Sequence, residues 1–451
     1  MKRKFYDVLL DWKAKRADKY AVLIDGARRV GKSWIAEEFG RREYEKCLVI
    51  DFSKASPALK RIFVENLQDL DTFFLLLENE MGVRLIRGKS LVIFDEVQEF
   101  PRAREAIKTL VKDGRYHYIE TGSLVSIKKN VEGIVIPSEE LHLRLYPMDF
   151  EEFLWAIGRE PTMDLIREFF GRRKPLGQEV NRRIMEAYRQ YLVVGGMPQA
   201  VEEFVKSRDL HEVDIAKRAI LDLYRQDIWK HAGGLAVKVE RIFDEIPDQL
   251  SRHEKKFKVS DLEESAKMRD YADSFKWLEN AMIVNLAWNS TEPNVGLKLN
   301  LNRKSVKCYL ADTGLLVSHA FDENELASAE VHRRILLDRI ELNKGMLVEN
   351  MAAQMLTAAG RRLYFHSESS PDVANDRMEI DFLVSKTKLT ARHNVSPIEI
   401  KSGDNTTHAS LDKYCRKYAE WCAEPFLFYD KDVKSEKGIT YLPHYMLPCM
   451  G

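Results

Sequence analysis

Apolar and polar positions in the N-terminal part of the chain alternate between short buried runs and helical spacing. The run Ala21–Asp25 predicts a strand, and positions 34–39 then place apolar residues on one face of a helix. Leu91–Phe94 and Tyr116–Glu120 are further apolar runs that predict buried strands. Strands that alternate with helices in this way predict a doubly wound, parallel α/β domain.

The middle of the chain changes to helical spacing. Residues 158–180 mix proline and glycine with charge and predict a connection or lid, whereas residues 181–232 carry apolar positions on helix faces. Three further helices are predicted over 236–251, 258–265 and 269–290, and strand-like segments follow over 297–316. Three helices followed by a hairpin are typical of a winged helix.

The C-terminal part predicts a second α/β domain. Residues 344–360 predict an amphipathic helix, and strands are expected over 361–368, 378–385 and 396–403, with a helix after them over 410–420. A chain of 451 residues is too long for one core at roughly 100 to 200 residues per domain. We therefore expect four segments, at residues 1–157, 158–232, 233–325 and 326–451.

Composition limits the classes of partner. Lys plus Arg equals Asp plus Glu at 71 each, so no global field attracts nucleic acid or an anionic membrane. The longest apolar runs fall far short of the roughly 20 residues of a bilayer span, and the basic start lacks the apolar region of a signal peptide. The five cysteines form no CxxC pair, which argues against a disulfide framework or zinc site. We expect a cytoplasmic protein with no membrane partner.

The turn after the first predicted strand fits a phosphate-binding loop. Residues 26–33, "GARRVGKS", match G-x-x-x-x-G-K-[ST] at every fixed position. Backbone amides of such a loop hold phosphates, Lys32 reaches the β and γ phosphates, and the Ser33 hydroxyl is a magnesium ligand. The expected ligands are ATP and Mg²⁺, bound by Gly26, Ala27, Arg28, Arg29, Val30, Gly31, Lys32, Ser33 and Trp34.

Two later strands supply the remaining nucleotide chemistry. Asp95 and Glu96 end the run at 91–94, where Asp95 would hold magnesium and Glu96 would orient or deprotonate the attacking water. The next strand ends at Thr121 and Ser123, whose hydroxyls can reach the γ-phosphate or that water, because ligands bind at the carboxyl ends of parallel strands.

The segments "GARRVGKS", "LVIFDEVQEFP", "YIETGSLVSIKKN", "RLYPMDFEEFLW" and "VVGGMPQAV" together resemble the AAA-type ATPases. The closer resemblance is to a prokaryotic, archaeal-ATPase-like group that joins this module to a C-terminal domain of unknown function. It implies that Lys32 and Ser33 are Walker A, Asp95 and Glu96 Walker B, and Ser123 or Thr121 sensor 1.

One departure concerns the arginine finger. Many relatives carry Gly-Arg shortly before the "LYP" segment, whereas this chain reads "IPSEELHLRLYP". Arg144 is nearby, but a strand arginine in a salt bridge is an equally good interpretation. We expect hydrolysis either to be slow or to depend on an arginine from another protomer or partner, so an oligomer is compatible with the sequence.

In the C-terminal segment, acidic residues and a lysine recur on predicted elements. Glu349 lies on the helix, Asp381 on the second strand, and Glu399 and Lys401 share one face of the third strand. Asp381 and Glu399 would hold a magnesium ion, and Lys401 would act on the attacking water. This order resembles the PD-(D/E)XK nuclease fold of restriction endonucleases, although Ile380 replaces the proline of that motif. The alternative for Glu399 and Lys401 is an ion pair on a half-exposed strand.

The sequence therefore predicts an AAA-type, Mg²⁺-dependent ATPase domain at 1–157, a helical linker at 158–232, a winged-helix-like domain at 233–325 and a nuclease-like domain at 326–451. The expected function is ATP hydrolysis that controls a nuclease-like domain, with DNA as a candidate partner. Charges on the predicted recognition helix are mixed, so DNA contact and a protein scaffold both stay open there. The alternatives are a nucleotide-gated regulatory or scaffolding switch without cleavage, or a toxin-antitoxin or phage-defence component.

Overall fold

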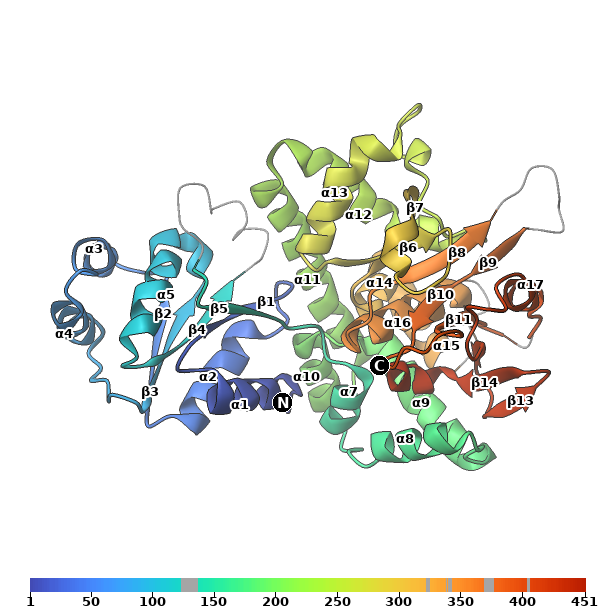
Figure 1. Ribbon diagram of the computed structural model, residues 1–451, viewed down its shortest axis with the longest axis horizontal. Coiled ribbons are helices and arrows are strands. Elements are labelled where there is room, and N and C mark those ends of the chain that lie inside the picture. Colours follow the sequence, from blue (N-terminus) through green and yellow to red (C-terminus); the bar gives the residue numbers. More distant parts are fainter. Residues whose placement is uncertain (123–136, 322–324, 338, 340–342, 369–376, 404–405) are drawn as a thin grey trace. The chain divides into compact units, whose positions relative to one another are not determined.

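The computed structural model describes residues 1–122, 137–321, 325–337, 339, 343–368, 377–403 and 406–451. The chain divides into two compact units, Met1–Tyr146 and Pro147–Gly451 (Figure 1). The finer division at residues 157, 232 and 325 stays a prediction. None of the described helices combines the length and the apolar character that a membrane crossing requires.

The first unit is built on a parallel five-stranded sheet. Its strands are β1 (Ala21–Asp25), β2 (Lys46–Asp51), β3 (Ser90–Asp95), β4 (His117–Gly122) and β5 (Glu140–Arg144), in the order β2-β3-β4-β1-β5. Every neighbouring pair is parallel. The carboxyl ends of all five strands therefore lie at one edge of the sheet, which confirms the predicted α/β fold.

Helices cover both faces of this sheet because successive strand residues point to opposite sides. Val22 and Ile24 pack with α1 (Phe5–Lys15) and α2 (Lys32–Glu43). Leu23 on the other face belongs to the core that holds α3 (Pro57–Glu65), α4 (Leu70–Met81) and α5 (Pro101–Asp113). All five residues of β1 are buried, as the uninterrupted apolar run predicts.

The second unit begins with helices and ends with mixed sheets. The helical spacing predicted over 181–232 and 236–251 is confirmed by α9 (Gln178–Val194), α10 (Pro198–Ser207), α11 (Leu210–His231) and α12 (Ala236–Ser251). Two helices at the start of the unit were not predicted: α7 (Phe150–Ala156), and α8 (Thr162–Arg172) within the expected connection at 158–180. Later helices are α13 (Met268–Asn280), α14 (Thr313–Ala320), α15 (Glu325–Leu336), α16 (Lys344–Ala358) and α17 (Ala409–Lys417).

The expected winged helix is only partly formed. Residues 258–265 contain a single 3-10 turn, Val259–Asp261, instead of a helix. The helix expected over 269–290 ends at Asn280 and is followed by Met282 in the left-handed conformation, with φ 56°. Residues beyond it form β6 (Val284–Ser290), which pairs with β7 (Leu301–Leu310) on one side and β8 (Tyr364–Glu368) on the other. Pairing on both sides outweighs the local helical pattern, and the hairpin extends the C-terminal sheet.

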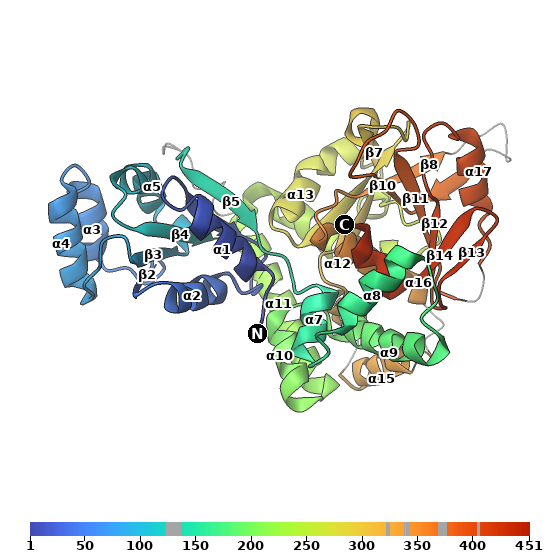
Figure 2. The same ribbon diagram turned by 60° about the horizontal axis from the view of Figure 1, so that its bottom comes forward.

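A single residue connects two sheets in the C-terminal part. One has the order β7-β6-β8-β9 and the other β10-β11-β12-β14-β13. Only Asp381 separates β9 (Met378–Ile380) from β10 (Phe382–Ser385). The remaining strands are β11 (Val395–Ile400), β12 (Phe426–Tyr429), β13 (Lys434–Glu436) and β14 (Ile439–Pro443) (Figure 2). Asp381 is thus at the junction of the two sheets.

Candidate functional site

The phosphate-binding loop connects β1 to α2. Helix α2 begins at Lys32, so the loop amides and the positive end of the helix dipole face the same point. Gly31 adopts φ 95°, which side chains rarely tolerate. Gly26 packs so tightly that a Cβ atom would lie 2.5 Å from the Leu145 carbonyl oxygen. The Lys32 ammonium donates to the carbonyls of Gly26 and Ala27 at 3.0 Å each, and so lies over the loop.

Three hydroxyl and carboxylate groups converge beside this loop. Ser33 Oγ donates to Asp95 Oδ1 at 2.7 Å, and Thr121 Oγ1 donates to the same carboxylate oxygen. The Glu96 amide in turn donates to Thr121 Oγ1 at 3.4 Å. Strand β4, which carries Thr121, lies between β1 and β3, so parallel pairing sets this convergence. The structure therefore brings Ser33, Asp95, Glu96 and Thr121 together.

The oxygen donors at this edge fit a magnesium ion. Mg²⁺ prefers hard oxygen ligands and usually takes one or two from protein while waters and phosphate oxygens complete its shell. Ser33 Oγ and the Asp95 carboxylate are such donors and already touch. Glu96 has φ 52° and accepts a hydrogen bond from Gln98, which fixes its carboxylate. Sequence reasoning missed Gln98, because its role depends on the turn geometry after β3.

Other predicted residues have different outcomes. Ser123 lies outside the described residues. Arg28, Arg29 and Trp34 are exposed, and Trp34 retains 42% of its accessible surface. Arg144 is exposed at the end of β5, in register with Asp25 of β1. These positions allow the loop side chains to face solvent while the loop backbone forms the cradle.

A polar cluster at β4 and β5 is absent from the sequence prediction. Arg104 of α5 forms a bidentate pair with Glu140 at 2.8 and 2.7 Å, and His142 Nε2 lies 2.5 Å from Glu140. Burial opposes ionisation of Glu140, but hydrogen bonds from Arg104 and His142 outweigh it and lower the pKa of Glu140 to about 2. Hydrogen bonds to Asp25 and Glu140 raise the pKa of His142 to about 9.

Glu120 belongs to the same cluster and directly precedes Thr121. Burial, reinforced by the neighbouring Glu140 carboxylate, raises the pKa of Glu120 well above its ordinary range. Burial thus favours the neutral form of Glu120, whereas hydrogen bonds from Arg104 and His142 favour the ionised form of Glu140. The signal that could have revealed this cluster is a single acidic residue inside an otherwise apolar buried strand, since such a residue needs a partner.

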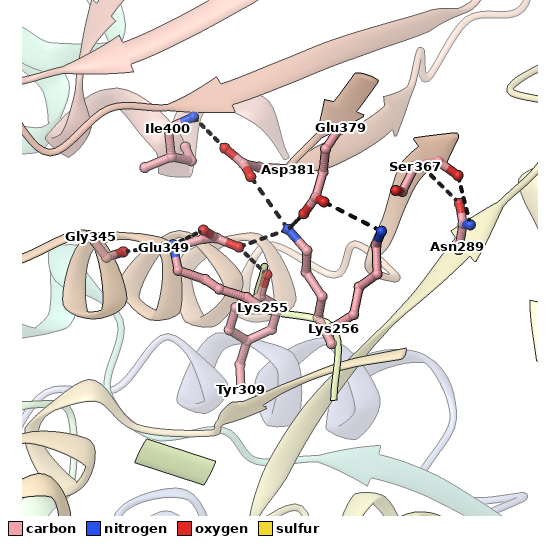
Figure 3. A network of polar contacts seen from close by, with 11 residues as sticks. Lys255, Lys256, Asn289, Tyr309, Gly345, Glu349, Ser367, Glu379, Asp381 and Ile400 are labelled. Atoms are coloured by element: carbon pink, nitrogen blue, oxygen red, sulfur yellow. Dashed lines mark hydrogen bonds and ion pairs between the residues drawn. The ribbon is translucent and has the colours of Figure 1, made fainter. Parts of the chain in front are cut away.

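Two of the predicted C-terminal site residues, Glu349 and Asp381, lie in a network with lysines (Figure 3). Lys307 of β7, whose side chain is 1% exposed, contacts Glu349 at 3.1 Å, Glu379 at 2.9 Å and Asp381 at 3.4 Å. Lys255 also pairs with Glu349, which accepts a hydrogen bond from Tyr309 OH at 2.5 Å. The structure thus joins the predicted Glu349 and Asp381 through a cation that the sequence prediction did not include.

Electrostatics in this network follow from burial and the lysines. Burial disfavours the charged form of Glu349, but Lys255 and Lys307 outweigh it and lower the pKa of Glu349 to about 2. Asp381 has the opposite outcome, because burial and the Glu349 charge raise its pKa. Burial alone would favour neutral Lys307, yet the surrounding carboxylates raise its pKa well above the ordinary value. Lys307 is therefore a permanent cation.

The other predicted pair lies on the adjacent strand β11. Lys401 Nζ is 2.5 Å from Glu399 Oε1, which confirms that the two side chains share a face. The Ile400 amide between them donates to Asp381 Oδ2 at 2.9 Å. Glu399 Oε2 is buried and accepts no hydrogen bond from a described residue. No group of three or more His, Cys, Asp and Glu residues in the described part of the chain could hold a metal.

Comparison with known families distinguishes three parts of the chain. The family model of the AAA domain matches residues 18–154, the part of this chain that contains the phosphate-binding loop and the parallel sheet. The similarity to the AAA domain family thus covers residues 18–154. Residues 185–325 and 344–447 match two domains of unknown function, DUF8612 and DUF4143. No curated protein matches the chain.

Three solved structures are distantly similar to the chain. The Walker-type ATPase PABY2304 of Pyrococcus abyssi is 14% identical, with a TM-score of 0.38 over 70% of this chain and 95% of that one. The tetratricopeptide-repeat STAND protein PH0952 of Pyrococcus horikoshii is 11% identical, with a TM-score of 0.27 over 80% and 49%. Cdc6p of Pyrobaculum aerophilum is 13% identical, with a TM-score of 0.26 over 74% of this chain and 93% of that one. None of them serves as a guide to the function of this chain.

Proposed function

We propose that the AAA domain binds ATP with Mg²⁺, hydrolyses it, and through its nucleotide state controls the C-terminal unit. The observation that carries the ATPase proposal is the convergence of Ser33, Asp95 and Thr121 beside the loop. These three groups come from three different elements. A tight turn at residues 26–33 without a phosphate-binding role would not explain why they lie together. Parallel strand ends are where nucleotide phosphates bind in such sheets.

Each residue has a role in phosphoryl transfer. The loop amides and Lys32 hold the triphosphate, while Ser33 and Asp95 would hold magnesium. Bound magnesium would neutralise charge on the β and γ phosphates. Glu96, oriented by Gln98, would position the attacking water and accept its proton.

Nucleotide binding and hydrolysis are tested separately. With a fluorescent ATP analogue, Lys32→Ala should weaken binding at least about tenfold, whereas Lys108→Ala on the exposed face of α5 should leave it unchanged. Glu96→Gln should retain binding and slow phosphate release at least about 100-fold. Equal affinity in Lys32→Ala and wild type would refute the site assignment.

The control function concerns the C-terminal part of the second unit. The element order α16, β8, β9 with β10, β11, α17 and β12 supports the proposal of a nuclease-like fold. The buried, unpartnered Glu399 oxygen supports a metal-dependent nuclease, but Lys307 between Glu349 and Asp381 favours the second candidate, a nucleotide-gated switch that does not cleave DNA. We adopt the switch as the better supported function.

A cleavage assay distinguishes these candidates. Wild type and Lys401→Ala are incubated with linear, branched and single-stranded DNA in Mg²⁺ and in Mn²⁺. The switch predicts intact DNA with both proteins. Cleavage by wild type that Lys401→Ala abolishes would establish the nuclease and remove the switch proposal.

A further inference from the structure

The carboxylate network around Lys307 is saturated by donors from the protein. Lys307 has three N–H groups and contacts three carboxylates, Glu349, Glu379 and Asp381. The nitrogen to oxygen distances of 2.9 to 3.4 Å suit an ammonium ion. A divalent metal would need oxygens at about 2.0 to 2.6 Å, so the carboxylates are spaced for a lysine.

The outer oxygens of these carboxylates also have partners. Glu349 Oε2 pairs with Lys255, and Glu379 Oε2 lies 3.7 Å from Lys256. Asp381 Oδ2 accepts the Ile400 amide hydrogen at 2.9 Å. Three carboxylates thus face three lysine cations, and the charges balance without any added ion (Figure 3).

The origin of the lysines differs from that of the carboxylates. Lys255 and Lys307 lie in the part that matches DUF8612, whereas Glu349 and Asp381 lie in the part that matches DUF4143. Lys307 projects from β7, two strands away from β8 in the sheet that ends at β9. The Lys307 cation therefore comes from a neighbouring segment and lies outside the elements α16 to β12, whose order resembles a nuclease.

We propose that Lys307 is a built-in cation that takes the place of a divalent metal among Glu349, Glu379 and Asp381. This inference rests on the proposed function, because it explains why the nuclease-like part acts without metal-dependent cleavage. The Lys307 ammonium holds the three carboxylates in an arrangement that fits no metal ion. Its removal lets the carboxylates close to the shorter oxygen distances that a divalent ion requires. Lys307 is in this sense the residue that determines which cation the cluster accepts.

Mn²⁺ binding to the full chain without nucleotide tests the proposal. Free Mn²⁺ is measured by electron paramagnetic resonance for wild type, Lys307→Ala, Lys307→Ala with Asp381→Asn, and Lys256→Ala. Lys307→Ala should gain an equivalent of Mn²⁺ bound at least about tenfold more tightly than by wild type. Asp381→Asn should abolish the gain. Lys256→Ala should show none, because Lys256 contacts only one outer oxygen of the cluster.

Two results would overturn the proposal. One is an equivalent of Mn²⁺ bound by wild type and lost in the single variant Asp381→Asn, a comparison that does not depend on the folding of Lys307→Ala. The other is a folded Lys307→Ala variant that binds Mn²⁺ no more tightly than wild type. If Lys307→Ala does not fold, Lys307→Gln is measured in its place, because it removes the charge and keeps most of the side-chain volume. ATP affinity should be unchanged in every variant. The ATPase proposal is tested separately, by the loss of ATP affinity in Lys32→Ala. The ATPase proposal and the Lys307 proposal can therefore fail independently.

Discussion

The buried pair of Arg104 and Glu140 should be a main source of stability for the AAA domain. We consider Arg104→Met, which keeps most of the side-chain volume and removes the charge. Interactions in the folded domain lower the pKa of Glu140 from 4.5 to about 2. Each tenfold change in acid dissociation corresponds to about 1.4 kcal/mol, so these interactions supply roughly 3 kcal/mol at neutral pH. Loss of one partner of a buried pair costs about 3 to 5 kcal/mol, in agreement with this value.

Hydrogen exchange of peptides from β4 and α5 reports the free energy of unfolding of this domain. Arg104→Met should lower it by about 3 kcal/mol at neutral pH. The matched control is Arg102→Met on the same helix, where an exposed pair with Glu105 at 3.1 Å should contribute less than about 0.5 kcal/mol. Because the folded pKa of Glu140 is depressed, its contribution is present above pH 4.5 and is lost as the pH falls through about 2. Equal losses in Arg104→Met and Arg102→Met would refute this reasoning.

Three further predictions concern neighbouring groups and the second unit. His142→Gln should lower the free energy of unfolding by about 1 kcal/mol below pH 6.5, a value reduced for solvent screening because the side chain is 43% exposed. The difference should disappear as the pH rises through about 9, and urea unfolding across this range measures it. Because burial favours the neutral form of Glu120, Glu120→Gln should lower the unfolding free energy at neutral pH less than Glu140→Gln does; a larger loss in Glu120→Gln would contradict this. Gly196→Ala should destabilise the second unit by about 2 to 3 kcal/mol in thermal unfolding, because its Cβ would lie 2.0 Å from the Met148 carbonyl oxygen. Gly171→Ala, with open space around it, is the control and should be neutral or slightly stabilising.

Local patterns were sufficient to predict which strand ends and loop residues lie together at the candidate nucleotide site. The buried strands and the loop at 26–33 are encoded by consecutive residues, and parallel pairing places the ends of β1, β3 and β4 together. Ser33 and Asp95 are 62 residues apart, yet their contact could be expected because each ends or follows a predicted parallel strand. The position of Thr121 follows by the same rule.

The C-terminal site was less accessible to sequence reasoning. Glu349 and Asp381 were identified, but their partner Lys307 is 42 and 74 residues away from them and lies in a segment predicted to be a separate domain. No local pattern distinguishes Lys307 from an exposed strand lysine. The failure at β6 has the same origin, because its strand conformation depends on pairing with β7 and with β8, whose sequence lies much later in the chain.

The direct pairing of β6 with β8 has a consequence for how this protein can change over evolution. Asn289 of β6 exchanges hydrogen bonds of 3.1 and 3.0 Å with the backbone of Ser367 in β8, across the border between the two segments of unknown function. Recombination that replaced only one segment would leave a strand edge unpaired and remove the lysines that balance Glu349 and Asp381. We therefore expect the two segments to be inherited together and substitutions at their border to arise in compensating pairs.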